Sequence, residues 1–582
     1  ACGEKAPVEA PSVTIQTAQG PVQGVSTDGA IINFKGIGYA APPVGDLRWA
    51  APAPAPVWTG VKIADSFAPM CRQELTEGDF VQDIIDGHSL GKVKTALIKS
   101  VISKQAISEQ SEDCLYLNVR TDNLSAGGNI AGAAKPVMVW IHGGGHQFGS
   151  GSQGYYQGND LVEKGVVLVT INYRLGPMGY MAHPALSADS PNGVSGNYGL
   201  QDQIAALKWV RDNISAYGGD PKNVTIFGES AGGWSVTELM ASPLASGLFH
   251  RAIAQSGSST YHLGDLNKTN GYWTSGHEVG VNIAARLGLG DNPSAADLRA
   301  VPADAIIDLV SEANEDLSGH MHTLRDGYIL PKNIGIAFRD GDINSVPFLT
   351  GYNDDEGTLF FDNDPEPSVW IEGFSRPNDA QDPAAQMAQL SPIYGADNSQ
   401  SLMDLYQLSD PDKFRKGGMA FMGDEIFGIN VRYAARQNAA AGSDTYLYSF
   451  TRTPPTKGQT IGAFHSAEIP FVFGTHQGVL GLTDDDLLIT DMMQTYWSNF
   501  AKTGNPNGAQ NVGPDNESLM EWAKHDGVNW MHFAGNDERR SGPITDYNSP
   551  ALNALEAGLM HHFKIIDSVP SASANQSAAR DK

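Results

Sequence analysis

The sequence predicts an α/β fold in which a large, mostly parallel sheet carries helices on both faces. A continuous apolar run occurs at residues 137–141, and mostly apolar, strand-prone runs occur at 166–173 and 224–227. Such runs are typical of strands buried on both faces. Helix-like segments separate them, and buried strands that alternate with helices form parallel sheets. A second observation is Ser230, a glycine-flanked serine that stands between a strand-like run and a helix-like run.

The composition is that of a large globular protein. The 582 residues are 41% hydrophobic and 18% charged, which is enough for a sizeable core. The formal net charge of −27 argues against nucleic acid and anionic membrane surfaces as partners. No apolar run in the sequence approaches the length of a membrane span.

Before the first buried strand, the sequence predicts edge structure and loops. Residues 1–11 are polar and rich in Pro and Ala, so we expect a mobile tail. Residues 13–32 alternate apolar and polar side chains around turn signals, as edge hairpins do. The prolines and glycines of residues 34–45 indicate a fixed loop. We interpret residues 74–110 as a surface excursion with one helix near residues 92–102.

Beyond these segments, strands and helices alternate. The apolar stripe of residues 200–214 predicts a helix, and another helix is expected at 491–500. Three more core strands are expected, at residues 252–255, 346–351 and 445–450, the last of them the final clear core strand.

The chain is predicted to form one domain over residues 12–566. We interpret the elements near 278–345 and 364–440 as a helical subdomain that covers the sheet. The small, polar residues 567–582 predict a disordered tail.

The cysteines leave two interpretations open. Cys2, Cys71 and Cys114 could be unrelated thiols, or one disulfide with one odd residue. Cys71 is the partner available to Cys114 within the domain, and their bridge would require an oxidising compartment. Ala1-Cys2-Gly3 has the form of the end of a bacterial lipobox, so Cys2 could carry a lipid anchor. The alternative is a stray terminal cysteine.

Ser230 lies in a segment with the form of a nucleophile elbow, Gly-Glu-Ser-Ala-Gly after a strand and before a helix. The turn is so tight that its flanking residues, Gly228 and Gly232, need to be nearly free of side chains. The serine hydroxyl would stand at the N-terminus of the helix, where the helix dipole favours developing negative charge. An inert serine in a glycine-rich turn is the alternative.

A second Gly-x-Ser-x-Gly, around Ser89, serves as an internal comparison. The run before it carries Gln82, Asp83 and Asp86, so it is a poor buried strand. Ser89 also precedes the chain's one His-Gly-Gly-Gly, whereas that loop comes first in hydrolases of this kind. Ser230 is therefore the predicted nucleophile.

The His-Gly-Gly-Gly segment, residues 142–145, directly follows the predicted strand 137–141. Three consecutive glycines let backbone N–H groups turn toward one point. With the N–H of Ala231 they could form an oxyanion hole. A flexible glycine loop is the alternative, which the adjoining core strand weakens.

A nucleophilic serine needs a base, and the base needs an orienting carboxylate. In this kind of fold the chain order is serine, acid, histidine. Six histidines follow the acid candidates: His465, His476, His525, His532, His561 and His562. Of these, His465 lies on a loop bounded by Gly and Pro after a core strand, where catalytic groups belong.

The acid is less well determined. Glu356, Asp354 and Asp355 all follow the strand at 346–351, and the residues alone barely separate them. We interpret Glu229 and Glu468 as supporting groups that flank the site.

No metal-binding motif, cysteine cluster or phosphate-binding loop appears in the sequence, so we expect no metal and no cofactor. His320-Met321-His322 is interpreted as facing solvent.

Eight segments together resemble the type-B carboxylesterase family, the cholinesterase-like branch of the α/β-hydrolase fold. They cover most of the chain in order: residues 34–40, 111–119, 142–145, 172–176, 228–232, 353–357, 462–470 and 499–507. Each motif alone is weak, but the set is highly specific.

The resemblance implies a site residue by residue. It implies Ser230 as nucleophile, Glu356 as acid and His465 as base, since the family's glutamate precedes a glycine as Glu356 precedes Gly357. It also implies the remaining features of the family: oxyanion donors at Gly144, Gly145 and Ala231, and a bridge between Cys71 and Cys114.

One departure concerns the loop between these two cysteines. It lacks any Trp, and cholinesterases place their choline-binding tryptophan there. The departure argues against recognition of quaternary ammonium groups by cation–π contact. His146 follows the glycine loop and Trp234 follows the elbow, and either could shape the pocket.

The resulting hypothesis is a carboxylic ester hydrolase of small to medium, and even bulky, esters. We expect it to be secreted or periplasmic in a bacterium, with an outer-membrane lipid anchor if Cys2 is lipidated. Hydrolysis of amides, carbamates or polyesters is chemically adjacent. A cholinesterase-like binding protein would typically lack residues of the triad. A lipase would need an apolar lid, for which residues 74–110 are too charged.

Overall fold

The computed structural model describes most of the chain. The described residues are 12–26, 30–74, 84, 109–260, 264–269, 273–290, 292–311, 317, 321–360, 383–453, 459–476, 482–508, 519–534 and 541–567. Cys2, Ser89 and the helix predicted near residues 92–102 lie outside them. The two predicted tails also lie outside, except that Asp567 ends the last helix.

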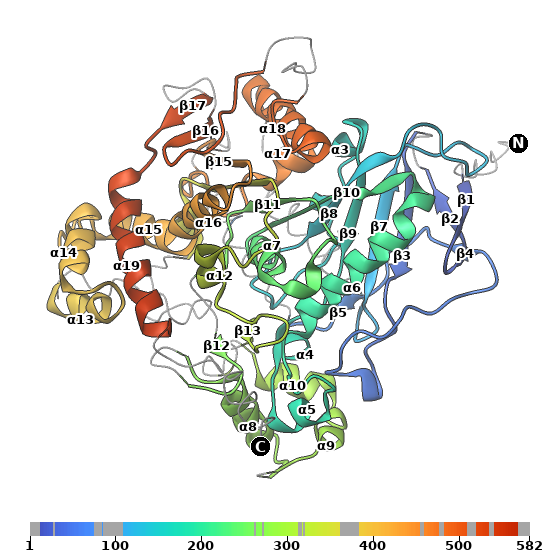
Figure 1. The fold of residues 1–582 in the computed structure, drawn as a ribbon, viewed down its shortest axis with the longest axis horizontal. Helices are drawn as coiled ribbons and strands as arrows, with labels where there is room; N and C mark the ends of the chain where they lie inside the picture. Colours follow the sequence, from blue (N-terminus) through green and yellow to red (C-terminus); the bar gives the residue numbers. More distant parts are fainter. Residues whose placement is uncertain are drawn as a thin grey trace, which may run out of the picture.

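The centre of the structure is a twisted sheet that runs across the whole molecule (Figure 1). Within the described residues it has 13 strands, in the order β1-β2-β3-β7-β9-β8-β10-β11-β14-β15-β16-β17, with β4 beside β2. The strands are β1 (Ser12–Thr17), β2 (Gly20–Val25), β3 (Ile32–Gly38), β4 (Lys62–Ile63), β7 (Tyr116–Thr121), β8 (Lys135–Ile141), β9 (Val167–Ile171), β10 (Gly219–Glu229), β11 (Arg251–Gln255), β14 (Phe348–Asn353), β15 (Thr445–Phe450), β16 (Asn529–Phe533) and β17 (Gly542–Thr545).

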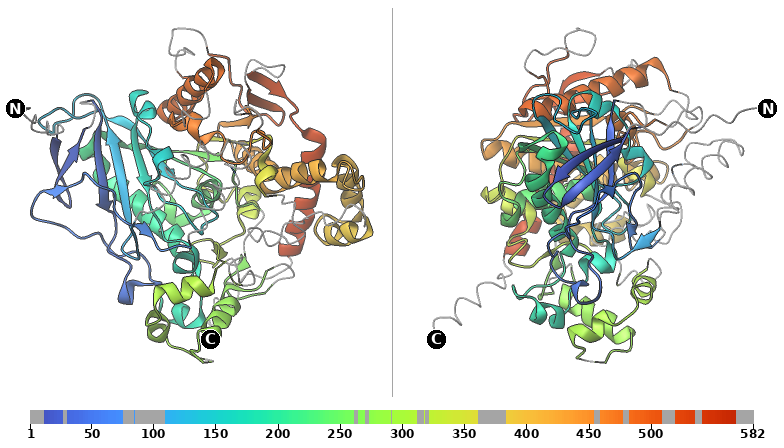
Figure 2. Two further views of the ribbon diagram at one scale, coloured as in Figure 1. Left: turned by 180° about the vertical axis from the view of Figure 1, so that it is seen from behind. Right: turned by 90° about the vertical axis from the view of Figure 1, so that its right-hand side faces the viewer.

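The middle of this sheet is parallel and its ends are antiparallel. Neighbouring strands from β9 through β8, β10, β11, β14 and β15 to β16 all pair in parallel. The β1–β2 hairpin lies at one edge, where it faces the viewer in the right-hand view of Figure 2. The predicted edge hairpin and the predicted mostly parallel sheet are both confirmed.

Two cores explain why the central strands are apolar throughout. Along β8, Val137, Val139 and Ile141 belong to one buried cluster, and Met138 and Trp140 belong to another. Successive side chains of a strand point to opposite faces, so each face has its own core. The first face is covered by α6 (Tyr198–Asn213), α7 (Ala231–Ala241), α12 (Ile334–Asp340) and α16 (Ile429–Ala440), and the second by α3 (Asp160–Glu163), α17 (Ile469–Phe473) and α18 (Asp484–Thr503).

The remaining helices form two groups beside the sheet. One group shares a small apolar core and lies at the bottom of Figure 1: α4 (Gly176–Tyr180), α5 (Pro184–Asp189), α8 (Gly276–Arg286), α9 (Ala295–Arg299) and α10 (Ala303–Leu309). The other group packs near α16: α13 (Pro383–Tyr394), α14 (Ala396–Leu405), α15 (Phe414–Gly423) and α19 (Ser549–Asp567).

Shorter elements complete the chain. The tight helical turns are η1 (Gly45–Leu47), η2 (Gly154–Tyr156), η3 (Ile214–Tyr217), η4 (Pro243–Ala245), η6 (Glu356–Leu359) and the π-helical η7 (Asp424–Gly428). Two small sheets pair β5 (Met70–Cys71) with β6 (Gln110–Ser111), and β12 (Gly264–Asp265) with β13 (Leu324–Arg325).

Two local predictions are wrong. Residues 34–38, expected in a loop, belong to β3, because a bulge at Gly36 accommodates the glycine while pairing with β7 continues. The strand at residues 445–450 is not the last in the core, since β16 pairs with it further along the chain. The run Trp530-Met531-His532-Phe533 is short, and its histidine obscures the apolar pattern.

Cys71 and Cys114 form a disulfide, as the family resemblance implies. Disulfides persist in oxidising compartments, so the bridge suggests an extracellular or periplasmic environment.

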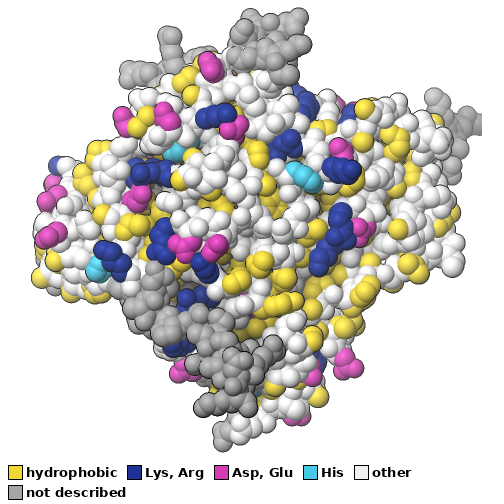
Figure 3. Space-filling view, in the orientation of Figure 1, with side chains coloured by type: hydrophobic (Ala, Val, Ile, Leu, Met, Phe, Trp, Pro, Cys, Tyr) yellow, Lys and Arg dark blue, Asp and Glu magenta, His cyan; other side chains and the backbone are white. Residues whose placement is uncertain are grey.

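Across the described residues, no helix is both long and apolar enough to cross a bilayer. On the face seen in Figure 3, basic and acidic side chains lie scattered among polar and apolar ones.

Candidate active site

Ser230 occupies a strained turn between β10 and α7. Its φ of 57° and ψ of −126° lie outside the regions that L-residues prefer. The Ser230 N–H donates to the carbonyl of Gln255 at 2.9 Å, and the Ser230 carbonyl accepts from the N–H of Trp234 at 2.9 Å. The backbone around the serine is therefore fixed on both sides, as a nucleophile elbow requires.

The two glycines that flank Ser230 lie directly against the end of β8. A Cβ at Gly232 would lie 2.1 Å from the carbonyl oxygen of Ile141, and one at Gly228 would lie 2.6 Å from the carbonyl carbon of Gly232. Contacts this short leave no room for a side chain. This close packing brings the elbow against the glycine loop that begins after Ile141.

The glycine loop, residues 142–145, folds back over the elbow. A Cβ at Gly143 would lie 3.0 Å from Ser230 Cβ. Gly144 and Gly145 have φ values of +98° and +60°, a left-handed backbone that favours glycine. The carbonyl of Gly144 accepts from the N–H groups of Gln147 and Phe148 at 2.9 and 3.1 Å, which closes the loop on itself.

His465 and Glu356 meet in the core beside this turn. His465 Nδ1 lies 2.6 Å from Glu356 Oε2, and both side chains are buried. Glu356 is the first residue of η6, which is separated from the end of β14 by two residues. Its Oε1 accepts from the N–H of Asn353 at 2.7 Å. The phenyl ring of Phe427 stacks on the imidazole with ring centroids 4.5 Å apart. The imidazole is thus held from one nitrogen and one face.

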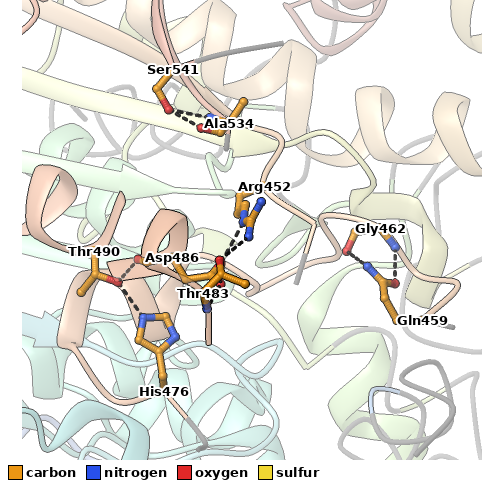
Figure 4. A network of polar contacts seen from close by, with 9 residues as sticks. All are labelled: Arg452, Gln459, Gly462, His476, Thr483, Asp486, Thr490, Ala534 and Ser541. Carbon is orange, nitrogen blue, oxygen red and sulfur yellow. Dashed lines mark hydrogen bonds and ion pairs between the residues drawn. The ribbon is translucent and has the colours of Figure 1, made fainter. Parts of the chain in front are cut away.

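A glutamine shapes the loop that carries His465 (Figure 4). Gln459 Oε1 accepts from the N–H groups of Ile461 and Gly462 at 2.8 and 2.9 Å. Figure 4 also shows Arg452, just beyond β15, donating to Asp486 of α18 at 2.8 Å. Both ends of the connection between β15 and His465 are therefore tied down by side chains.

The competing acids contact other groups. Asp355 Oδ2 accepts from the N–H of Ala463 at 2.8 Å, and Asp354 accepts from the hydroxyl of Tyr547. Glu356 is therefore the candidate acid that the structure brings to His465.

The other late histidines also have different surroundings. His476 contacts Thr490, His525 contacts the carbonyl of Asn529, and His532 bridges Ser449 and Thr451. His561 is exposed on α19, and the side chain of His562 lies outside the described part.

Glu229 reaches the other nitrogen of the imidazole. Its Oε1 lies 3.2 Å from His465 Nε2 and accepts from the hydroxyl of Ser466 at 2.6 Å. Glu468 is buried one step away, where it accepts from Gln255 at 3.0 Å and from Asn353 at 2.7 Å. Three buried carboxylates, Glu229, Glu356 and Glu468, thus surround one histidine.

These carboxylates set the protonation of the cluster. Burial alone would lower the pKa of His465, but the charges of Glu229 and Glu356 outweigh it and raise the pKa to about 9. Burial raises the pKa of Glu229 to about 8, opposed by the attraction of His465. Burial and the charge of Glu356 also raise the pKa of Glu468. Glu229 and His465 therefore compete for a proton across 3.2 Å.

The histidine and the serine are linked through Glu229, which directly precedes Ser230 in the elbow. His465 Nε2 faces the carboxylate of Glu229 at 3.2 Å, on the side of the ring opposite Glu356. Hydrogen bonds between catalytic groups are often long in ligand-free structures and tighten when substrate binds.

His146 and Trp234 lie together beyond the glycine loop. His146 is buried, its Nε2 lies 3.0 Å from Ser235 Oγ, and its ring stacks on Tyr180 at 4.9 Å. The Trp234 ring meets His146 at 5.9 Å and His322 at 6.2 Å. His322 is half-buried and Met321 is buried, so the interpretation of this segment as solvent-facing is wrong for both. Its two histidines and one methionine carry no periodicity that could have indicated burial.

Residues that support the site were missed where their contacts span distant segments. Phe427 and Gln73, which bonds to the backbone of Gly149, are examples. The sequence around either residue carries no local signal of these contacts. Across the described part of the chain, no group of three or more His, Cys, Asp or Glu residues is arranged to hold a metal ion.

A strand–turn–helix with a strained serine, on a mostly parallel sheet with helices on both faces, defines an α/β-hydrolase. Solved structures agree. A PNB esterase superimposes with a TM-score of 0.72 at 30% identity, covering 93% of this chain and 99% of its own. A carboxylesterase of Geobacillus stearothermophilus does so with a TM-score of 0.73 at 29% identity, with the same coverage.

The chain belongs to the carboxylesterase family, whose model matches residues 10–543. A fumonisin B1 esterase of Sphingopyxis macrogoltabida is 34% identical over 509 residues, 85% of this chain and 83% of its own length. A para-nitrobenzyl esterase of Bacillus subtilis is 34% identical over 505 residues, 84% and 90% of the two chains. The protein is therefore a serine-dependent carboxylic ester hydrolase.

Proposed function

We propose that Ser230, His465 and Glu356 hydrolyse carboxylic esters through an acyl-enzyme. The observation that carries the proposal is the position of His465. Its Nδ1 is bonded to the buried Glu356, while its Nε2 points to the residue next to Ser230. An imidazole that is oriented by a carboxylate and lies against the residue preceding a strained serine supports general-base activation of that serine's hydroxyl.

In acylation, His465 Nε2 removes the proton from Ser230 Oγ as the oxygen attacks the ester carbonyl carbon. The carbonyl π electrons move onto oxygen and give a tetrahedral oxyanion. The imidazolium is stabilised by Glu356 through the Nδ1 hydrogen bond. When the carbonyl re-forms, the C–O bond to the alcohol breaks, and the leaving oxygen takes the proton from His465.

In deacylation, a water molecule repeats these steps on the acyl-enzyme. Its oxygen attacks the acyl carbon as His465 takes its proton, and a second oxyanion forms. Collapse of this intermediate breaks the bond to Ser230 Oγ, which takes the proton back from His465. The products are a carboxylic acid and the free enzyme, so no cofactor is consumed.

Backbone N–H groups of Gly144, Gly145 and Ala231 are proposed to hold both oxyanions. Ala231 is the first residue of α7, where helical N–H groups have no partner within the helix. The positive φ values of Gly144 and Gly145 favour the exposed, turned backbone that such donors require. Glu229 and Glu468 are proposed as supporting groups that set the charge around His465.

The proposed substrates are small to medium esters, with bulky esters included. The chain is similar to both a fumonisin B1 esterase and a para-nitrobenzyl esterase, whose names give two different esters. His146 and Trp234 are proposed to line part of the pocket, since both lie beside the elbow.

The test is hydrolysis of p-nitrophenyl acetate, butyrate and octanoate by the wild type, Ser230→Ala and Ser89→Ala. We expect activity to disappear in Ser230→Ala alone, and the chain-length trend to report the size of the acyl pocket. Full activity in Ser230→Ala would overturn the proposed nucleophile.

We also propose that the protein is secreted or periplasmic, which the disulfide supports. Lipidation of Cys2 stays a prediction from the sequence, because Cys2 lies outside the described residues. Intact mass spectrometry of the protein expressed from its natural gene in a bacterium tests it.

A further inference from the structure

The side chain of Gln73 pairs with the backbone of Gly149 through both ends of its amide. Gln73 Oε1 accepts from the Gly149 N–H at 2.7 Å, and Gln73 Nε2 donates to the Gly149 carbonyl at 3.1 Å. The same Nε2 donates to the carbonyl of Cys71 at 2.9 Å. Only 7% of Gln73 is exposed. The buried amide of Gln73 thus satisfies both backbone groups of Gly149, as a neighbouring strand would do in a sheet.

Gly149 is in turn packed against the start of the glycine loop. A Cβ at Gly149 would lie 2.4 Å from His142 Nδ1 and 2.9 Å from the carbonyl oxygen of Gly143. The residue before it, Phe148, donates its N–H to the carbonyl of Gly144 at 3.1 Å. A clamp on Gly149 therefore fixes the far end of a closed loop whose near end holds Gly143 and Gly144.

A second side-chain amide, that of Asn172, connects the residues after Gly149 to the segment that contains Gln73. Asn172 Oδ1 accepts from the Gly151 N–H at 2.9 Å and from Ser150 Oγ at 3.0 Å. Asn172 Nδ2 donates to the carbonyl of Pro69 at 3.2 Å. The segment from Pro69 to Gln73 is itself anchored by the disulfide at Cys71. The glycine loop is thus connected to a covalently fixed support.

We propose that Gln73 is a positioning residue for the oxyanion hole: by clamping Gly149 it holds the N–H groups of Gly144 and Gly145 where the oxyanion forms. The inference rests on the proposed function of those two N–H groups. Donors to an oxyanion act within a narrow range of distances, and small misplacements lower the rate steeply. Glycines hold such a backbone poorly on their own, because they have the most conformational freedom.

The test compares Gln73→Met with Gln19→Met. Gln19 is a matched control because it is also 7% exposed. It donates to the carbonyls of Gly38 and Pro56 and accepts from Trp209, so it loses as many hydrogen bonds. Its partners lie outside the glycine loop. Methionine keeps the length of the side chain and removes both the donor and the acceptor.

For Gln73→Met we expect kcat on p-nitrophenyl butyrate to fall about tenfold, less than the loss of a whole oxyanion donor, with KM changed less than twofold. Inhibition by phenylboronic acid, whose tetrahedral adduct with serine places an oxygen in the oxyanion hole, should weaken by the same factor. Gln19→Met should lower the unfolding midpoint by about as much as Gln73→Met does. It should leave kcat and boronate inhibition within twofold of wild type.

Gln73→Glu provides a second variant if the methionine variant folds poorly. It keeps an acceptor for the Gly149 N–H but places negative charge against two carbonyls, so kcat should fall at least as far. Equal kcat losses in Gln73→Met and Gln19→Met, or losses confined to KM, would overturn the inference. Ser230→Ala in the same series separates the claims, since activity surviving there would overturn the proposed function instead.

Discussion

Glu229 Oε1 lies 3.2 Å from His465 Nε2, the ring nitrogen opposite the one that contacts Glu356. The imidazole is therefore flanked by carboxylates on both sides before any substrate arrives. Its Nε2 is also the atom that we propose accepts the proton of Ser230. The carboxylate of Glu229 and the hydroxyl of Ser230 thus compete for contact with the same ring nitrogen.

The first prediction concerns pH. Glu229 and Glu356 raise the pKa of His465 to about 9 against the effect of burial. The base is active only as neutral imidazole, so kcat/KM of the wild type should increase with pH through that range. Glu229→Gln removes one of the two charges and lowers the pKa of His465, so the acidic limb of the profile should move to lower pH.

The measurement is kcat/KM for p-nitrophenyl acetate from pH 5 to pH 10, corrected for spontaneous hydrolysis. Glu468→Gln is the control, because Glu468 contributes least among the causes that raise the pKa of His465. The acidic limb of the Glu468→Gln profile should move less than that of Glu229→Gln. A limb that stays in place in Glu229→Gln, or moves further in Glu468→Gln, would contradict this explanation.

The second prediction concerns the glycine loop. A Cβ at Gly144 would lie 2.2 Å from the carbonyl oxygen of Phe148, at a φ of +98°. Gly144→Ala should therefore displace the loop and lower kcat by about 10² to 10³, the range for losing one oxyanion donor. Steady-state kinetics check this.

Gly193→Ala is the matched control for that variant. Gly193 also has a positive φ, +69°, but nothing lies within 4 Å of the position of its Cβ. It should lose some stability from backbone strain and keep its kcat. Equal kcat values for the two variants would show that the loop tolerates displacement.

How far the sequence predicts this structure depends on whether a signal is local. The signal for β8 and β10 is local: each is visible in a short stretch of sequence, because a strand buried on both faces is apolar along its length instead of alternating. The choice of Glu356 over Asp355 is not local. Both follow β14, and only the turn η6 directs Glu356 to His465 while Asp355 bonds to Ala463.

Contacts between distant segments could not be predicted at all. Gln73 and Gly149 are 76 residues apart in sequence, and Phe427 reaches His465 from a π-helical turn in another segment. Nothing in the residues around Gln73 or Phe427 indicates these partners. Both residues would be taken for ordinary polar or core positions.

The third prediction tests the support of the imidazole face. Phe427 stacks on His465 at 4.5 Å, whereas Phe421, on α15, packs against Tyr406 at 5.3 Å. Both phenylalanines are buried, so each change to Ala should cost about 3–5 kcal/mol of stability. Only Phe427→Ala should also lower kcat, by about tenfold, because a loosened imidazole loses its alignment.

Circular dichroism melts and kinetics below the unfolding midpoint separate these two effects. A parallel loss of kcat in Phe421→Ala would mean that core loosening in general, and not the contact with His465, explains the result.

The fourth prediction concerns the disulfide. Cys71 and Cys114 are 43 residues apart in sequence, and a bridge over a loop of this length contributes about 4 kcal/mol in the chain-entropy model. The double variant Cys71→Ala/Cys114→Ala should unfold at a lower temperature than the wild type. Dithiothreitol should lower the midpoint of the wild type to that of the variant and leave the variant unchanged. A midpoint in the variant equal to that of the oxidised wild type would contradict this stabilisation.

The most direct test of the central claim is to trap the nucleophile. Diethyl p-nitrophenyl phosphate should phosphorylate Ser230 with release of p-nitrophenolate, in step with the loss of esterase activity. Peptide mapping by mass spectrometry should then find one diethylphosphoryl group on the peptide that contains Ser230, and none on Ser230→Ala. A label on Ser89 or another residue that accounts for the lost activity would contradict the assignment of Ser230 as the nucleophile.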